Sequence, residues 1–150
     1  MSMSYEWCEQ WMEQAILLST MSSCPRGQVG AFIVDEYNNP ISAGFNGAPR
    51  GAEGNLCSVD FCERDDFEVE SGTRIEVGCH HAEQNALCNA AKKGIRLENS
   101  TMIISTLPCL LCAKLIHHAG ISSVVLPIDS KYSRDGINYL LLHRIKIVYI

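Results

Sequence analysis

The chain lacks the long apolar run that a membrane-spanning helix requires. Such a helix needs about 20 consecutive apolar residues, and polar or charged residues interrupt every apolar stretch of this 150-residue sequence well before that length. The N-terminus also lacks the basic start of a secretory signal, because it carries Glu6, Glu9 and Glu13 instead. These two absences argue against membrane insertion and secretion, and we expect a cytoplasmic protein.

The chain also has little positive charge. Its 12 lysine and arginine residues are outnumbered by 17 aspartate and glutamate residues, which gives a formal net charge of -5. Proteins that bind a nucleic-acid polymer usually present a basic stripe, so this balance argues against such a partner. One or two local cations would still be enough to bind a mononucleotide.

No repeat, low-complexity tract or linker divides the sequence. Its length suits one ordinary domain, and 47% of its residues are hydrophobic, which is enough for a core without disulfide bonds. We therefore predict a single domain over residues 1–150. The eight cysteines are then better explained as metal ligands than as disulfide partners, because a cytoplasmic protein keeps its thiols reduced.

Hydrophobic periodicity predicts a sheet with helices on both faces. The expected helices are 4–22, 82–93, 109–118 and 134–142, and the expected strands are 29–35, 40–45, 101–105, 121–126 and 145–150. The first helix would carry Trp7, Trp11 and Leu18 along one stripe, with Cys8, Met12 and Ala15 beside it. The first two strands would form an antiparallel hairpin, whereas the later alternation of strand and helix favours parallel pairing. The expected fold is a three-layer α/β/α arrangement with a mixed five-stranded sheet.

Two short segments carry the candidate chemistry. His81-Ala82-Glu83 opens one predicted helix, and Pro108-Cys109-Leu110-Leu111-Cys112 opens the next. The helix and strand between them form a crossover that would return both helix starts to the same sheet edge. Because Cys109 and Cys112 are spaced i, i+3, their sulfurs can reach one metal. One imidazole and two thiolates leave the fourth position of a tetrahedral zinc ion open for water.

This H-x-E and P-C-x-x-C pattern is typical of zinc-dependent nucleobase deaminases. Zinc lowers the pKa of a bound water to about 7. Glu83, which would bind no metal, could carry the released proton to N3 of a cytosine ring and then protonate the leaving amino group. A C-x-x-C pair alone is more often a structural zinc half-site or a redox pair, but that interpretation leaves His81 and Glu83 unexplained.

Beyond these motifs, nearly the whole chain resembles the cytidine/deoxycytidylate deaminase superfamily. The similarity includes residues 22–31 (S-S-C-P-R-G-Q-V-G-A), residues 44–51 (G-F-N-G-A-P-R-G, with Phe45 where tyrosine is usual) and residues 129–132 (D-S-K-Y). The first two segments point to the nucleotide branch of the family. The resemblance therefore implies a hydrolase acting on a cyclic amidine, which converts dCMP to dUMP and ammonia and supplies dUMP for thymidylate synthesis.

The resemblance also implies substrate contacts. Asn46 would hydrogen-bond the deoxyribose or base, the backbone N–H of Ala82 would reach the cytosine carbonyl, and Tyr132 would lie at the ribose or phosphate end. Arg26 and Arg50 are candidates for the 5′-phosphate, because a guanidinium matches phosphate with paired donors. Family members are commonly homohexamers that dCTP activates and dTTP inhibits, and we carry these properties as expectations.

Four further cysteines remain: three lie in or beside a long polar segment, residues 46–79, and one follows the first predicted helix. Relatives of this type often carry a structural zinc in this region. The candidate ligands are Cys24, Cys57, Cys62 and Cys79. Four thiolates would anchor a segment that otherwise lacks a core. His80 could replace Cys79 as the fourth ligand, although strand alternation would point His80 to the opposite face. The alternative is buried cysteines that pack as small apolar groups.

Other functions are compatible with the same motifs. One is a deaminase of free cytidine or of tRNA adenosine, of which the acidic charge disfavours the tRNA version. Another is a non-catalytic module, a domain that zinc stabilises and that binds nucleotides without catalysing a reaction. Glu83 argues against the module, because a protein that only binds needs no proton carrier.

Overall fold

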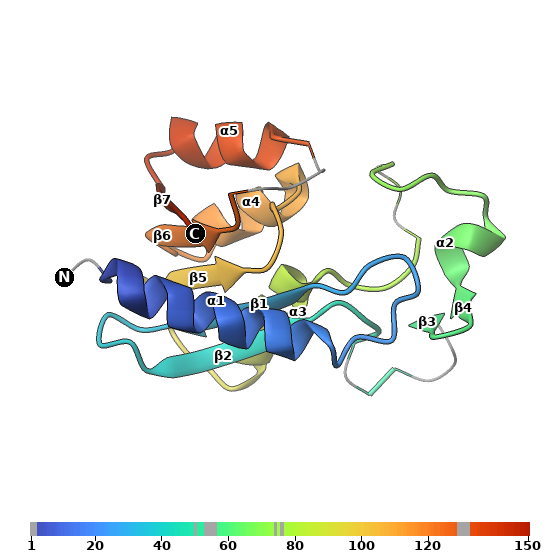
Figure 1. Ribbon diagram of the computed structural model, residues 1–150, viewed down its shortest axis with the longest axis horizontal. Helices are drawn as coiled ribbons and strands as arrows, with labels where there is room; N and C mark the ends of the chain where they lie inside the picture. The colour runs from blue at the N-terminus through green and yellow to red at the C-terminus, as the bar shows by residue number, and fades with distance from the viewer. Residues whose placement is uncertain (1–2, 50, 53–56, 74, 76, 129–132) are drawn as a thin grey trace.

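The computed structural model describes residues 3–49, 51–52, 57–73, 75, 77–128 and 133–150, and its centre is a five-stranded sheet (Figure 1). The strands are β1 (Gly30–Val34), β2 (Pro40–Phe45), β5 (Thr101–Ile104), β6 (Ser123–Leu126) and β7 (Lys146–Tyr149). Their order is β2-β1-β5-β6-β7. β1 pairs antiparallel with β2 and β5, whereas β5, β6 and β7 are parallel. The predicted mixed five-stranded sheet is confirmed.

Helices form a layer on each face of the sheet. α1 (Tyr5–Ser19) covers one face, and α3 (Ala82–Lys92), α4 (Leu110–His118) and α5 (Asp135–Leu142) cover the other (Figure 1). α4 and α5 share a face because right-handed crossovers that advance in one direction across a parallel sheet place their helices together. Among the described helices, none has the length and apolar character of a transmembrane segment.

The central strands supply an apolar core to each layer. On β5, Ile103 packs with the residues of α1, whereas Met102 and Ile104 pack with those of α3, α4 and α5. All three side chains are fully buried. This alternation is the two-residue period of a strand with both faces covered, and it explains why the sequence of β5 shows no polar face.

α1 packs mainly through the residues predicted to lie beside the tryptophan stripe. The residues that it buries are Cys8, Met12, Ala15 and Ser19. Trp7, in contrast, is 48% exposed. A Cβ atom at Gly30 would overlap the carbonyl oxygen of Ala15. The helix backbone therefore lies close to β1 at Ala15, where only a small side chain fits, whereas Trp11 is partly buried and contacts Phe32 of β1 with a ring-centroid distance of 5.5 Å.

Residues 57–78 form a projection beside the sheet, which we call the excursion (Figure 1). It contains the two-stranded hairpin of β3 (Cys57–Ser58) and β4 (Phe61–Cys62), followed by the short helix α2 (Glu63–Asp66). The sequence predicted only a long polar loop here. These elements escaped prediction because two-residue strands and a four-residue helix are too short to show a hydrophobic period.

Candidate metal centre

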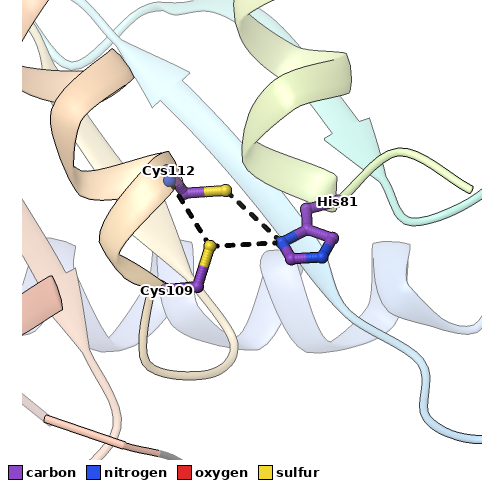
Figure 2. A group of neighbouring side chains, drawn as sticks. All are labelled: His81, Cys109 and Cys112. Atoms are coloured by element: carbon purple, nitrogen blue, oxygen red, sulfur yellow. Dashed lines mark hydrogen bonds between the residues drawn. The ribbon is translucent and has the colours of Figure 1, made fainter. Parts of the chain in front are cut away.

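The starts of α3 and α4 meet at one edge of the sheet. His81 is the N-cap residue of α3, and Cys109 is the N-cap residue of α4. Cys112 lies one turn into α4, so its sulfur and that of Cys109 face the same point. Figure 2 shows the imidazole of His81 directed at both sulfurs. The structure thus brings together three residues that the sequence separates into two motifs.

The distances within this cluster suit a zinc ion. The His81 Nδ1 atom lies 3.6 Å from the Cys109 Sγ atom and 3.4 Å from the Cys112 Sγ atom. Tetrahedral zinc with ordinary Zn–N and Zn–S bond lengths holds such atoms about 3.6 Å apart. Among the side chains that the structure describes, this is the one group of three histidine, cysteine or acidic residues whose ligand atoms lie within 4.8 Å of one another. Both the donor atoms and their separations therefore fit zinc.

The two thiols of the cluster differ in acidity. The backbone N–H of Cys112 donates to the Cys109 Sγ atom at 3.4 Å, as the first amides of a helix do with an N-cap side chain. Hydrogen bonding with the Cys112 thiol, aided by His81, lowers the pKa of Cys109 to about 4. Hydrogen bonding to Cys109, together with burial, raises the pKa of Cys112. Because a coordinating thiol loses its proton, Cys112 would release its proton when zinc binds.

Glu83 supplies a buried carboxyl beside the cluster. It lies in the first turn of α3 and is 3% exposed. Burial raises its pKa above the usual range of a glutamate. A carboxyl with a raised pKa can accept and return a proton near neutral pH, as a general acid–base group must.

Polar side chains of α3 form hydrogen bonds to the backbone of β2, and these bonds help to position His81 at the start of α3. Asn85 donates from Nδ2 to the carbonyl oxygen of Phe45 at 2.8 Å, and Asn89 donates to that of Ala43 at 2.8 Å. A Cβ atom at Gly44 would overlap the backbone of α3. The sequence motifs predict no role for these asparagines. Their spacing of four residues, which places both on one helix face, was the available signal.

α5 supports the loop that carries the cysteines. A Cβ atom at Gly136 would overlap the carbonyl oxygen of Pro108 and lie 2.9 Å from that of Cys109. Gly136 is buried at the start of α5. The absence of a side chain at this position lets the helix rest directly on the backbone next to the metal ligand. No local sequence pattern indicates this contact, because it depends on the packing of α5.

Asn46 uses its side-chain amide to hold a neighbouring loop. Its Oδ1 atom accepts a hydrogen bond from the Val29 N–H at 2.8 Å, and its Nδ2 atom donates to the Gly27 carbonyl at 2.8 Å. Ser22 reinforces the loop by donating to the Asn46 carbonyl at 2.7 Å. An amide has two donor hydrogens and two acceptor lone pairs, and the bonds to Val29 and Gly27 use one of each.

The other predicted substrate contacts lie at different places in the structure. Ala82 is fully buried at the start of α3, directly after the histidine ligand. Arg26 forms an ion pair with Asp65 of the excursion, in which its Nη1 atom lies 3.4 Å from the Oδ1 atom of the carboxylate. Arg50 and Tyr132 lie outside the described residues.

The cysteines predicted to bind a second zinc lie around the excursion. Cys62 is buried as the N-cap residue of α2, and Cys24 and Cys79 are partly buried. Cys57 is paired with Cys62 across the β3–β4 hairpin, and its side chain lies outside the described part of the structure. His80 lines a cavity of about 630 Å³ between α3 and α4.

An imidazole, two thiols and a buried carboxyl at the meeting point of two helix starts define a zinc-dependent deaminase site. In sites of this kind three protein ligands leave one position of a zinc ion open, and a carboxyl that is not a ligand can carry protons. The fold provides both from helices on the same face of the sheet.

Comparisons with known proteins give the same class. Residues 5–128 match the cytidine and deoxycytidylate deaminase zinc-binding region. Human deoxycytidylate deaminase is 37% identical over 131 residues, which are 87% of this chain and 69% of that protein. ComE operon protein 2 of Bacillus subtilis is 33% identical over 130 residues, 83% of this chain and 61% of that protein.

A solved structure extends the match over almost the whole chain. The dCMP deaminase of the cyanophage S-TIM5, crystallised in complex with dCMP and dUMP, has a TM-score of 0.78 and 31% identity, and the match covers 99% of this chain and 100% of that chain. The chain belongs to the cytidine and deoxycytidylate deaminase family. The family and the fold predicted from the motifs are thereby confirmed.

Proposed function

We propose that this protein catalyses the hydrolytic deamination of dCMP to dUMP and ammonia and so supplies dUMP for thymidylate synthesis. The observation that carries the proposal is the cluster of His81, Cys109 and Cys112 beside the buried Glu83. The match to a deaminase crystallised with dCMP and dUMP supports the choice of substrate.

Glu83 would be the proton carrier of the reaction. A zinc ion held by the three ligands would supply a polarised water of lowered pKa. Glu83 would accept a proton and transfer it to N3 of the cytosine ring, which makes C4 more open to attack by oxygen. After the oxygen adds to C4, Glu83 would accept a second proton from the new C4 hydroxyl group and transfer it to the amino group, so that ammonia leaves as the C4 carbonyl forms. Because Glu83 ends in its starting state, one carboxyl serves as both base and acid.

The substrate would be held by backbone and side-chain groups at the same sheet edge. The Ala82 N–H would donate to the cytosine carbonyl, and the unused donor and acceptor of Asn46 would reach the deoxyribose or base. Arg26 and Arg50 would bind the 5′-phosphate, and Tyr132 would contact the ribose or phosphate end. The partly buried guanidinium of Arg26 supports this assignment, because a buried cation favours an anionic ligand.

We further propose a structural zinc at the base of the excursion, and three contacts support it. Cys57 and Cys62 lie directly opposite each other in the hairpin. The Gly78 N–H donates to the Glu63 side chain at 3.0 Å, which brings the residue before Cys79 to the residue after Cys62. Pro25, the neighbour of Cys24, lines the same small cavity as Cys62. The backbone segments that carry the four candidate cysteines therefore lie near α2, although the described thiols of Cys24, Cys62 and Cys79 do not form a group at metal-binding distance.

The remaining proposals rest on the family resemblance. They are assembly into a homohexamer, activation by dCTP and inhibition by dTTP. A single domain and a cytoplasmic location are proposed from the length and composition of the sequence. The net charge of -5 supports a small nucleotide over a nucleic-acid polymer as substrate.

Steady-state ammonia release from dCMP, CMP and deoxycytidine, with and without dCTP, tests the function. We expect dCMP to have the highest kcat/KM. Glu83→Gln should lower kcat by about 10²- to 10⁴-fold while the protein keeps its catalytic zinc, because it removes the proton carrier and leaves the ligands. Fastest turnover of deoxycytidine would favour the nucleoside alternative, and nucleotide binding without ammonia release would favour the non-catalytic module.

A further inference from the structure

Arg26, the proposed phosphate ligand, already has an anionic partner in the excursion. Its Nη1 atom lies 3.4 Å from the Oδ1 atom of Asp65, which belongs to α2. The two side chains are unequally buried, since that of Arg26 is 19% exposed and that of Asp65 is 60% exposed. The guanidinium of Arg26 is therefore the more enclosed partner of the ion pair, and the carboxylate of Asp65 faces solvent.

The ion pair leaves Arg26 short of hydrogen bonds. The Nη1 atom of Arg26 is buried and, within the described part of the chain, has no hydrogen-bond partner. A guanidinium carries five N–H donors, and a buried donor without an acceptor costs free energy. One carboxylate oxygen at ion-pair distance does not meet this demand. A phosphate, with three oxygens and nearly two negative charges, would meet it better.

The backbone around Arg26 is held in place, so that Asp65 is the partner that can be exchanged. Asn46 bonds Ser22, which precedes Arg26, and also Gly27 and Val29, which follow it, as described above. Gln28 also donates from Nε2 to the carbonyl oxygen of Ser22 at 2.7 Å, which closes the loop. Asp65, in contrast, is exposed on a helix of four residues.

We propose that Asp65 is a specificity-determining residue, an internal competitor that occupies Arg26 until the 5′-phosphate of a nucleotide replaces it. This proposal rests on the proposed function, because it takes Arg26 as the phosphate ligand. Two anions cannot share one guanidinium without mutual repulsion. Phosphate binding therefore breaks the ion pair between Asp65 and Arg26, and α2 loses this contact with the loop that carries Arg26. A nucleoside, which has no phosphate, leaves the ion pair intact.

Replacing Asp65 by Asn tests the competition. In Asp65→Asn, the KM for dCMP should fall about two- to five-fold, the range expected for a pair with one exposed partner. The kcat for dCMP and the kcat/KM for deoxycytidine should stay unchanged. Inorganic phosphate should inhibit more strongly by the same factor. Asp66→Asn is the matched control, since it removes the same charge one residue further along α2 and should change none of these values.

Equal effects of the two substitutions would overturn the proposal, because general charge would then explain them. In Arg26→Gln, the further change Asp65→Asn should have no effect, and a persisting effect would also overturn it. Calorimetric titration with inorganic phosphate separates this proposal from the proposed function, since it needs no turnover. Tighter phosphate binding in Asp65→Asn alone would uphold the competitor even in a protein that leaves dCMP unchanged. Unaltered phosphate binding would reject it even in an active deaminase.

Discussion

The metal-ligand cluster and the excursion hold their functional residues in two different ways. The cluster is placed by packed backbone, since Gly44 and Gly136 allow helices to approach their neighbours closely. In the excursion, Cys62 is the one buried residue among those described, and Val59 and Phe67 are 71% and 62% exposed. Packing therefore fixes the cluster before any metal binds, whereas the excursion relies on polar contacts and, as we propose, on its own zinc.

Replacing one cysteine in each region should give the largest difference in activity between the two regions. Cys112→Ser should remove the catalytic zinc and lower kcat/KM by at least about 10³-fold, because the polarised water is lost. Cys62→Ser should reduce the zinc content from two ions to one and leave kcat/KM within a few-fold of the original value. Metal analysis and ammonia release on both variants check this. Equal loss of activity would show that the excursion is part of the catalytic machinery.

Replacing a glycine by alanine should destabilise the protein more near the metal-ligand cluster than in the excursion, because the cluster is more tightly packed. Gly136→Ala should lower the free energy of unfolding by about 3 kcal/mol, because the added methyl group overlaps the Pro108 carbonyl. It should also weaken zinc binding at the cysteines that follow. Gly72→Ala, at a φ of +84° with open space around it, should cost only about 1 kcal/mol. Chemical unfolding and zinc competition with a chelator measure both effects, and similar losses would contradict the ranking.

Arg64 should matter more for the excursion than for the cluster. It donates to the carbonyl oxygens of Thr73, Ile75 and Val77 at 2.7, 3.2 and 3.3 Å. Arg64→Met removes these bonds, each worth about 1 kcal/mol, and should speed proteolysis within the excursion. Ammonia release from dCMP should change little. Arg96→Met, which removes an exposed arginine that pairs with Glu98, is the control and should leave proteolysis unchanged.

Replacing Glu83 should change the free energy of unfolding by the smallest amount. The buried carboxyl that the reaction needs should make the folded protein slightly less stable. Burial raises its pKa, so folding favours its protonated form, and the ionised form present at higher pH destabilises the protein. In metal-free protein at pH 8, Glu83→Gln should therefore raise the free energy of unfolding by about 1 kcal/mol. The gain should shrink as the pH falls and Glu83 becomes protonated. Urea unfolding at pH 8 and pH 5.5 measures it, with the exposed Glu9→Gln as control, and a gain that grows at low pH would contradict the assignment.

Local sequence signals were enough where the structure depends on local periods and caps. The helix predicted at 82–93 is observed at Ala82–Lys92, and Gly94 follows it with a φ of +66°. The parallel strands of the second half lie within a few residues of their predicted positions. The residues of the metal cluster could be named because each lies at a helix start, where the motif spacing determines the geometry.

Features that depend on tertiary contacts could not be predicted in this way. The buried face of α1 is set by how closely the helix approaches Gly30, which a helical period does not reveal. The ion pair of Arg26 joins residues from two distant segments. The excursion is held by hydrogen bonds from side chains to carbonyl oxygens, which leave no apolar pattern in the sequence.

The position of Cys109 as an N-cap residue also bears on how such enzymes evolve. Its sulfur accepts a hydrogen bond from the α4 backbone, and serine is among the residues preferred at that position. A cysteine codon is a single nucleotide away from a serine codon. One such mutation in a duplicated gene would remove a zinc ligand while the helix kept its cap. This architecture would therefore let a paralogue lose its catalytic activity and keep its fold.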